Sequence, residues 1–256
     1  MIKKNIKIII TLLVAVACFG INKKAEAADK YISNVTVNSV KKINGISFVA
    51  KQYQKNDTYK YKIVMKKNGV NKTIAENTTC DFTTNGKFIY YCKVEKKINS
   101  YQTQNSIYKY AIKTGKKSKV LSGKQYTVCG CSGRYLYCGV DEEADGVTLY
   151  SYDLKKHKKR YMVSGVASVV SNGKYVITST NSGDAGNYPI NRFNLNGTGK
   201  KKICDGSLLK GEKDRLYYYV TRSSDWKNKI YICKFSGKNK KAITGWIKRI
   251  PDKYWQ

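Results

Sequence analysis

The chain has few of the residues on which enzymes most often depend. It contains one histidine, His157, and its 17 acidic residues are outnumbered by 49 lysines and arginines. His157 stands in a lysine-rich run, residues 155–160, whereas a catalytic base needs a shielded and oriented setting. Zinc sites normally need several histidines or closely spaced cysteines. We therefore expect no Ser-His-Asp, Cys-His or zinc chemistry, and no cofactor.

Apolar runs of membrane-spanning length are also missing. The longest run, residues 8–21, follows a lysine-rich start and has about the length of a signal-peptide core, which is short for a membrane span. An Ala-Glu-Ala sequence ending at Ala27 provides small residues where a signal peptidase cleaves. We predict a signal peptide over residues 1–27, cleavage before Ala28, and a secreted protein.

Two other interpretations of this leader stay open. The apolar run is kept as an N-terminal anchor in one of them. In the other, the chain is lipid-anchored at Cys18, which follows three small residues.

Five copies of one pattern run through residues 28–256. Each copy has a turn, an apolar-aromatic run, a polar loop, a second aromatic run and a lysine-rich turn. Successive copies begin 40 to 47 residues apart, at NGISFVA, NGKFIYY, SGRYLYC, NGKYVIT and KDRLYYY, whose turns lie at Gly45, Gly86, Gly133, Gly173 and Asp214. A period near 40 with several strands per period is typical of β-propeller blades. We therefore predict a single all-β propeller domain.

Each repeat divides into four strands, as the fourth copy illustrates. Its strands begin near Ala167 (ASVVS), Lys174 (KYVITST), Pro189 (PINRFNL) and Lys200 (KKKIC). Asn-Gly between such runs is a strong hairpin signal, because both residues adopt positive φ. No segment shows sustained helical periodicity, so we predict essentially no helix.

The chain ends suggest how the ring closes. Residues 31–37 alternate like a strand, GWIKRI from Gly245 resembles a first strand, and KYWQ resembles the start of a second. Pairing strands from both termini removes an exposed edge. We predict five full blades and a composite sixth blade, with a five-bladed ring as the alternative.

The repeated (N/S)G-x-(Y/F)-(I/L/V)-Y and (I/L)-Y-x-(Y/C) runs carry a resemblance to a known family. Over residues 31–256 the chain resembles TolB-like propellers, particularly secreted bacterial ones related to the propeller of low-density-lipoprotein receptors. The YWTD signature of those receptors is absent. The resemblance implies a propeller fold and names no ligand.

Lysines recur at the turn between the third and fourth strands of each repeat. Such recurrence concentrates charge on one face, where it attracts an anionic polymer or surface; the alternative is that these lysines only block edge pairing. Outside the cell, anionic wall polymer or membrane lipid is a better partner than nucleic acid, and a protein partner stays open. The basic-face candidates are Lys116, Lys117, Lys155, Lys156, Lys158, Lys159, Arg160, Lys200, Lys201 and Lys202.

The opposite face is predicted to carry variable polar loops, where binding tends to occur. Its ligand-binding candidates are Trp226, Tyr188 and Asp184. The loop DEEADG is a weak calcium candidate through the oxygens of Asp141, Glu143 and Asp145, although its spacing does not match an EF-hand.

Seven of the eight cysteines follow the predicted leader. Cys80 and Cys92 lie symmetrically about the Gly86 turn, and Cys129 or Cys131 can face Cys138 across the Gly133 turn. These pairs are predicted either as disulfides across hairpins or as buried thiols that fill the core.

Together these features indicate a secreted, monomeric, non-catalytic propeller that acts as a binding or scaffold module at the bacterial cell surface. A secreted carbohydrate-active enzyme is the alternative.

Overall fold

The computed structural model describes residues 40–43, 45–55, 58–99, 102–141, 146–180 and 188–255. The chain divides into two units, residues 1–33 and 34–256, and all described residues belong to the second. The predicted leader, its cleavage before Ala28 and the predicted strand at residues 31–37 lie outside the described residues. No helix in the described ranges is long and apolar enough to cross a bilayer.

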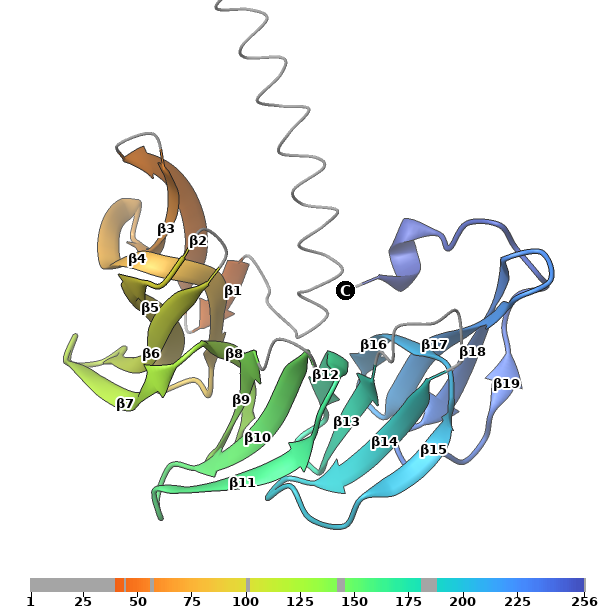
Figure 1. The fold of residues 1–256 in the computed structure, drawn as a ribbon. Coiled ribbons are helices and arrows are strands. Elements are labelled where there is room, and N and C mark those ends of the chain that lie inside the picture. Colours follow the sequence, from red (N-terminus) through yellow and green to blue (C-terminus); the bar gives the residue numbers. More distant parts are fainter. Residues whose placement is uncertain are drawn as a thin grey trace, which may run out of the picture. The chain divides into compact units, whose positions relative to one another are not determined.

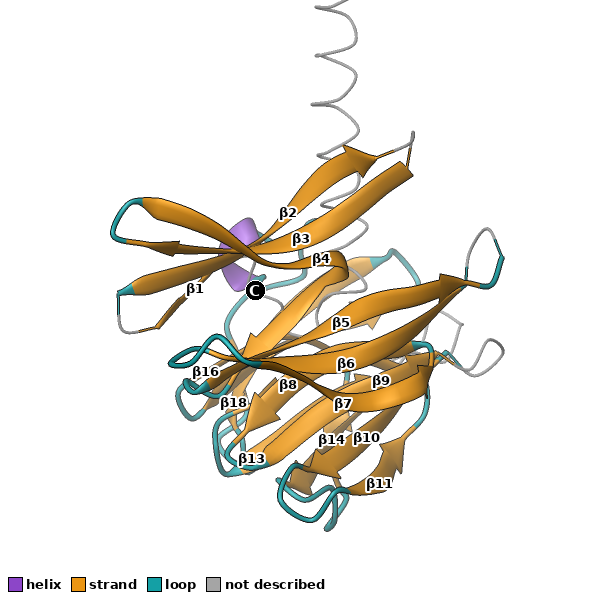
Figure 2. Cartoon of the chain, turned by 90° about the vertical axis from the view of Figure 1, so that its left-hand side faces the viewer, coloured by secondary structure: helices purple, strands orange, loops and turns teal. Residues whose placement is uncertain are grey.

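The described residues form strands β1 to β19 and one short 3₁₀ helix (Figures 1 and 2). The first seven strands make one sheet in sequence order. They are β1 (Val40–Ile43), β2 (Ile46–Lys55), β3 (Thr58–Lys67), β4 (Val70–Thr84), β5 (Phe88–Lys97), β6 (Thr103–Ala111) and β7 (Lys117–Lys124).

Strand β4 is 15 residues long and serves two blades. Its first half pairs with β3, its second half pairs with β5, and a register shift between Thr78 and Phe82 interrupts the second pairing. It is therefore the outer strand of the first blade and the inner strand of the second.

Three separate four-stranded antiparallel sheets follow, each in sequence order. The third blade contains β8 (Tyr126–Ser132), β9 (Tyr135–Asp141), β10 (Val147–Asp153) and β11 (Lys158–Val163). The fourth contains β12 (Val166–Ser171), β13 (Tyr175–Thr180), β14 (Pro189–Asn194) and β15 (Lys201–Asp205). The fifth contains β16 (Ser207–Glu212), β17 (Arg215–Arg222), β18 (Lys227–Lys234) and β19 (Lys241–Ala242). The five blades match the five repeats of the sequence.

The Asn-Gly turns form as the sequence predicts. The side-chain oxygen of Asn172 accepts the backbone N–H groups of Lys174 (3.1 Å) and Tyr175 (2.9 Å). Gly173 has a φ of +82°, a conformation that costs glycine nothing because it lacks Cβ. This chemistry fixes the first hairpin of the blade.

Hydrophobic clusters fill the space between successive blades. Phe48 and Ile63 of the first blade pack with Phe82 and Tyr91 of the second, and equivalent clusters join the second to the third, the third to the fourth and the fourth to the fifth. Each fully buried large side chain contributes about 1.5–3 kcal/mol, so these clusters supply much of the stability. Many tyrosines are therefore core residues.

The C-terminal residues cover the opposite face of the fifth blade. Leu209 and Ile230 on this face pack with Ile250, and Tyr254 and Trp255 lie against the same cluster. The predicted strands of a composite blade do not form here: Ile247 instead makes a single bridge to Asn228, and Asp252–Tyr254 form the 3₁₀ helix. The C-terminal segment packs there because it buries the apolar face of the fifth blade.

Candidate functional site

Each antiparallel blade places its first and third connections at one end, which we call the turn end, and its second connection at the other, the loop end. A pocket of about 830 Å³ lies at the turn end between the first and second blades. Such a volume is within the range of small-ligand sites.

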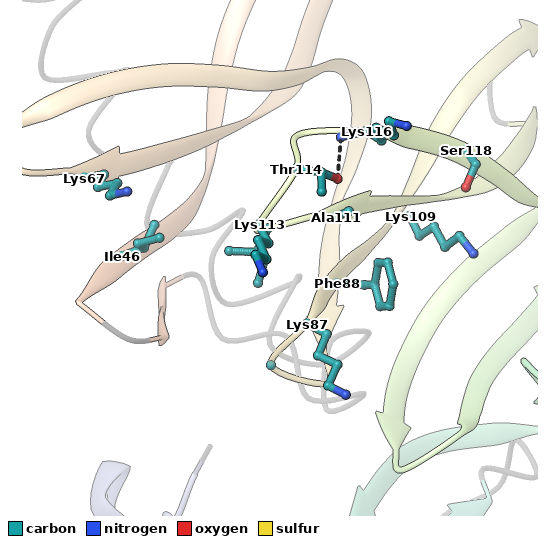
Figure 3. A pocket seen from close by; sticks show the side chains of 12 residues that line it. Ile46, Lys67, Lys87, Phe88, Lys109, Ala111, Lys113, Thr114, Lys116 and Ser118 are labelled. Carbon is teal, nitrogen blue, oxygen red and sulfur yellow. Dashed lines mark hydrogen bonds between the residues drawn. The ribbon is translucent and has the colours of Figure 1, made fainter.

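Five lysines line this pocket, and none of its lining residues is acidic. Ile46 and Lys67 come from the first blade, and Figure 3 shows them on one side of the pocket, with the residues of the second blade on the other. The remaining lining residues are Gly86, Lys87, Phe88, Lys109, Ala111, Ile112, Lys113, Thr114, Lys116 and Ser118.

Backbone hydrogen bonds hold the pocket's second-blade wall. Ile112 donates its N–H to the carbonyl of Lys87 (3.0 Å), and Ala111 donates to the carbonyl of Lys116 (2.8 Å). The hydroxyl of Thr114 accepts the N–H of Lys116 (3.4 Å, Figure 3). The lysine side chains therefore project from an ordered turn.

The positive charge of this pocket is not neutralised from within the described residues. No ion pair there involves Lys67, Lys87, Lys109, Lys113 or Lys116. The Lys109 ammonium lies 5.3 Å from the Phe88 ring centroid, an attraction that leaves its charge in place. Like charges gathered in one pocket repel one another, and an anion that enters relieves this repulsion.

The third-blade turn is built differently, because a carboxylate caps it. Asp153 accepts the backbone N–H groups of Lys155 (3.0 Å) and Lys156 (3.1 Å) and pairs with Arg134 at 3.0 Å. Desolvation raises the pKa of Asp153, but these hydrogen bonds and the Arg134 charge outweigh it and hold the pKa below its usual range.

The structure divides the predicted basic-face residues into two groups. Lys116, Lys155, Lys156 and Lys200 lie in turns. Lys117, Lys158, Lys159, Arg160, Lys201 and Lys202 lie within the outer strands β7, β11 and β15. Lysines on outer strands also discourage edge pairing, so the second group suits the alternative that the sequence left open.

Two of the strand lysines have local partners. The ammonium of Lys159 lies 4.4 Å from the Tyr150 ring centroid and 5.8 Å from that of Tyr126. Lys202 pairs with Asp205 at 2.8 Å. Lys159 therefore contributes to packing as well as to charge.

The loop end holds the predicted ligand-binding candidates. Trp226 lies at the tip of the β17–β18 hairpin with 63% of its surface exposed and a φ of +53°. The Tyr188 carbonyl accepts the N–H of Gly206 (2.8 Å), and Asp184 lies outside the described residues. A shared site of the three candidates therefore stays a prediction.

The predicted calcium loop is only partly described. Asp141 is exposed at the end of β9, whereas Glu143 and Asp145 lie outside the described residues. Across the described ranges, no group of three potential metal ligands occurs.

The predicted disulfides do not form. Cys92 and Cys138 are buried thiols. Cys138 lies opposite Val128, and Cys131 lies opposite Leu136; Cys80 falls within the register shift of β4 and hydrogen-bonds to Asp81. Cross-strand register, rather than distance from the turn, prevents these bonds.

His157 occupies the β10–β11 turn with a φ of +54°. Its Nδ1 lies 3.0 Å from the hydroxyl of Tyr152. This contact fixes the ring against the third blade.

The sequence analysis missed most of the pocket. Only Lys116 was among its basic-face candidates. Lys113 shares the turn of Lys116, Lys109 lies within β6, and Lys67 and Lys87 lie beside other turns. One usable signal existed: Lys87 directly follows a repeat turn, at the same end of its blade as Lys116.

Solved structures support the fold. The β-propeller domain of the Trilobed protease from Pyrococcus furiosus, described as revealing an open velcro topology, superposes with a TM-score of 0.59 at 15% identity, covering 81% of this chain and 71% of that one. Pyrococcus horikoshii acylaminoacyl peptidase gives 0.58 at 15% identity over 81% of this chain. This chain spans 39% of that peptidase.

TolB from Acinetobacter baumannii, at a TM-score of 0.49 and 13% identity over 77% of this chain and 50% of TolB, is too distant to support a conclusion. Protein-family models give no match, and neither do curated proteins. The predicted all-β, multi-bladed propeller is confirmed, and identities this low extend no further than the fold.

Proposed function

We propose that this chain is a secreted, non-catalytic propeller that binds anionic polymer of the bacterial cell surface through the turn end of its blades. The observation that carries the proposal is the pocket between the first two blades, whose five lysines face no acidic lining residue. A lysine ammonium offers three donors and no acceptor, so this pocket suits an anion and disfavours a cation.

The charge of the whole chain supports the same function. Its formal net charge is +32, and such an excess raises the local concentration of anionic partners through long-range attraction. Positive charge at the turn end also comes from lysines in the turns of the third and fourth blades, Lys155, Lys156 and Lys200. Wall polymer is the partner we favour, since anionic polymer is abundant at a secreted protein's destination.

Co-sedimentation with purified anionic wall polymer tests the proposal. Replacing Lys113 and Lys116 together with glutamine should weaken binding at low salt. The matched control replaces Lys96 and Lys97, which are exposed at the loop end of the same blade, so that the change in net charge is identical.

Equal loss of binding in both double variants would show that only net charge matters and would contradict a turn-end site. Release of reducing sugar from the polymer by the wild-type protein would favour the carbohydrate-active alternative over a binding module.

A further inference from the structure

The pairing of the second strand with the third shows how the second blade differs from the others in one side chain. In blades two to five, one residue of the third strand lies opposite the start of the second strand. Ala111 pairs with Phe88, Asp153 with Tyr135, Asn194 with Tyr175 and Lys234 with Arg215. In blades two, three and five, the next residue of the third strand donates its backbone N–H to the carbonyl of the residue just before the second strand, at 3.0, 3.0 and 3.1 Å. These positions can therefore be compared directly.

The residue that follows the first turn completes the comparison. In the third blade it is Arg134, which pairs with Asp153, and in the second it is Lys87, where the equivalent third-strand residue is Ala111. In the fifth blade the charges are the other way round: the acidic residue, Asp214, follows the first turn, and the basic residue, Lys234, lies on the third strand. The fourth blade has Lys174 with the neutral Asn194, so it too keeps a cation without a carboxylate. Among these four blades, only the second has an apolar residue, Ala111, at this position.

This single difference accounts for two properties of the pocket. Ala111 is itself a lining residue, and its small side chain leaves space that a carboxylate would fill. It also leaves the charge of Lys87 without the partner that Arg134 has in the equivalent position. At this position Ala111 therefore adds neither bulk nor negative charge to a pocket that five lysines line.

The polar groups of the lining indicate the type of anion. The lining contains lysines and no arginine. Lysine binds an anion, phosphate included, as a point charge without the fixed fork geometry of arginine. Thr114 and Ser118 add hydroxyl groups, and a phosphate offers more acceptor oxygens to such donors than a carboxylate does.

Charge density narrows the ligand further. Five lysines share a space of about 830 Å³, so a ligand that compensates them carries several negative charges close together. We infer that the pocket binds a chain of closely spaced phosphate groups, a phosphodiester or polyphosphate polymer, with Ala111 as the residue that determines specificity. This inference rests on the proposed function and names the ligand class for the same site.

Calorimetric titration of the whole mature protein with linear tripolyphosphate tests the inference, with citrate as the carboxylate probe. Ala111→Asp restores the arrangement seen with Asp153 and is compatible with the fold for that reason. Asn194→Asp is the matched control, because it makes the same charge change at the equivalent position of the fourth blade, outside the pocket.

We expect saturable binding of tripolyphosphate by the wild type, weakening by about tenfold or more in Ala111→Asp, because a charge of the ligand's own sign enters the site. Asn194→Asp should stay within about twofold of the wild type. Equal affinities in the two variants would overturn the inference, and so would citrate binding as tight as tripolyphosphate.

The two proposals fail in different ways. If wall polymer still co-sediments while Ala111→Asp binds tripolyphosphate normally, the phosphate pocket is wrong and the turn-end function stands. If the wild type binds neither wall polymer nor tripolyphosphate, both are wrong.

Discussion

Tyr219 and Trp255 meet edge to face, with ring centroids 6.2 Å apart and planes at 66°. Tyr217 and Tyr254 also lie 6.2 Å apart, with their ring planes tilted at 38°. These two contacts fasten the C-terminal segment to the face of the fifth blade that no other blade covers in the described part of the chain. The fold therefore ends in a cap rather than a strand.

Replacing Trp255 with alanine should destabilise the protein by about 1–3 kcal/mol, because a half-buried aromatic ring leaves an apolar face exposed. Deleting residues 254–256 should cost at least as much. Urea denaturation measures the effect. Trp226→Ala removes an exposed ring and should change stability by less than about 0.5 kcal/mol; equal effects of Trp255→Ala and Trp226→Ala would rule out the cap.

Stability should fall as the pH drops towards the carboxylate range, partly because of Asp153. Its folded-state pKa is lowered, so its stabilising contribution is present above the unfolded-state pKa and is lost as pH falls through the folded-state value. Asp153→Asn should be less stable than wild type at pH 6, and the difference should shrink as the pH falls below the unfolded-state pKa of the carboxyl. A constant difference across this range would contradict the assignment.

The buried thiols should be chemically silent in the native protein. Burial raises the pKa of Cys138 to about 12 and that of Cys92 well above its usual value, so almost no thiolate exists at neutral pH. Iodoacetamide should label both only after unfolding. Non-reducing mass spectrometry that found either cysteine in a disulfide would show that the strand register described above is wrong.

Replacing Lys159 should lower the stability of the protein more than replacing a lysine of the neighbouring third-blade turn. Lys159→Gln should cost about 0.5–1 kcal/mol, since its ammonium lies over the Tyr150 and Tyr126 rings. Lys155→Gln, in the turn itself, should cost almost nothing. Thermal unfolding compares the two, and equal melting temperatures would argue against the packing role.

Local signals explain why most of the fold was predictable. Glycines such as Gly173 mark the hairpins, and alternating aromatic runs mark the strands, since both depend on neighbours in sequence. The continuous strand β4 was missed because its two halves belong to different repeats. The C-terminal cap was missed because GWIKRI has a strand-like pattern. Its conformation instead depends on packing against the apolar face of the fifth blade.

The candidate site was much less predictable. Lys116 belongs to an obvious basic turn. Lys87 joins it through the pairing of strands within the second blade, and Lys67 joins it only through the packing of two blades. The choice between the two cysteine alternatives, disulfides or buried thiols, has a related difficulty. A register shift of the kind found between Thr78 and Phe82 changes which residues face each other without leaving a sequence signature.

The most direct test of the central claim is the salt dependence of binding to purified anionic wall polymer, measured side by side for wild type and for a variant with Lys87, Lys113 and Lys116 replaced by glutamine. Wild-type affinity should fall steeply as salt rises, because ion pairs with the polymer release counterions. The variant should bind more weakly at low salt and show a shallower slope, so that the two approach each other at high salt. Equal affinity and equal slope for the two proteins would contradict the account.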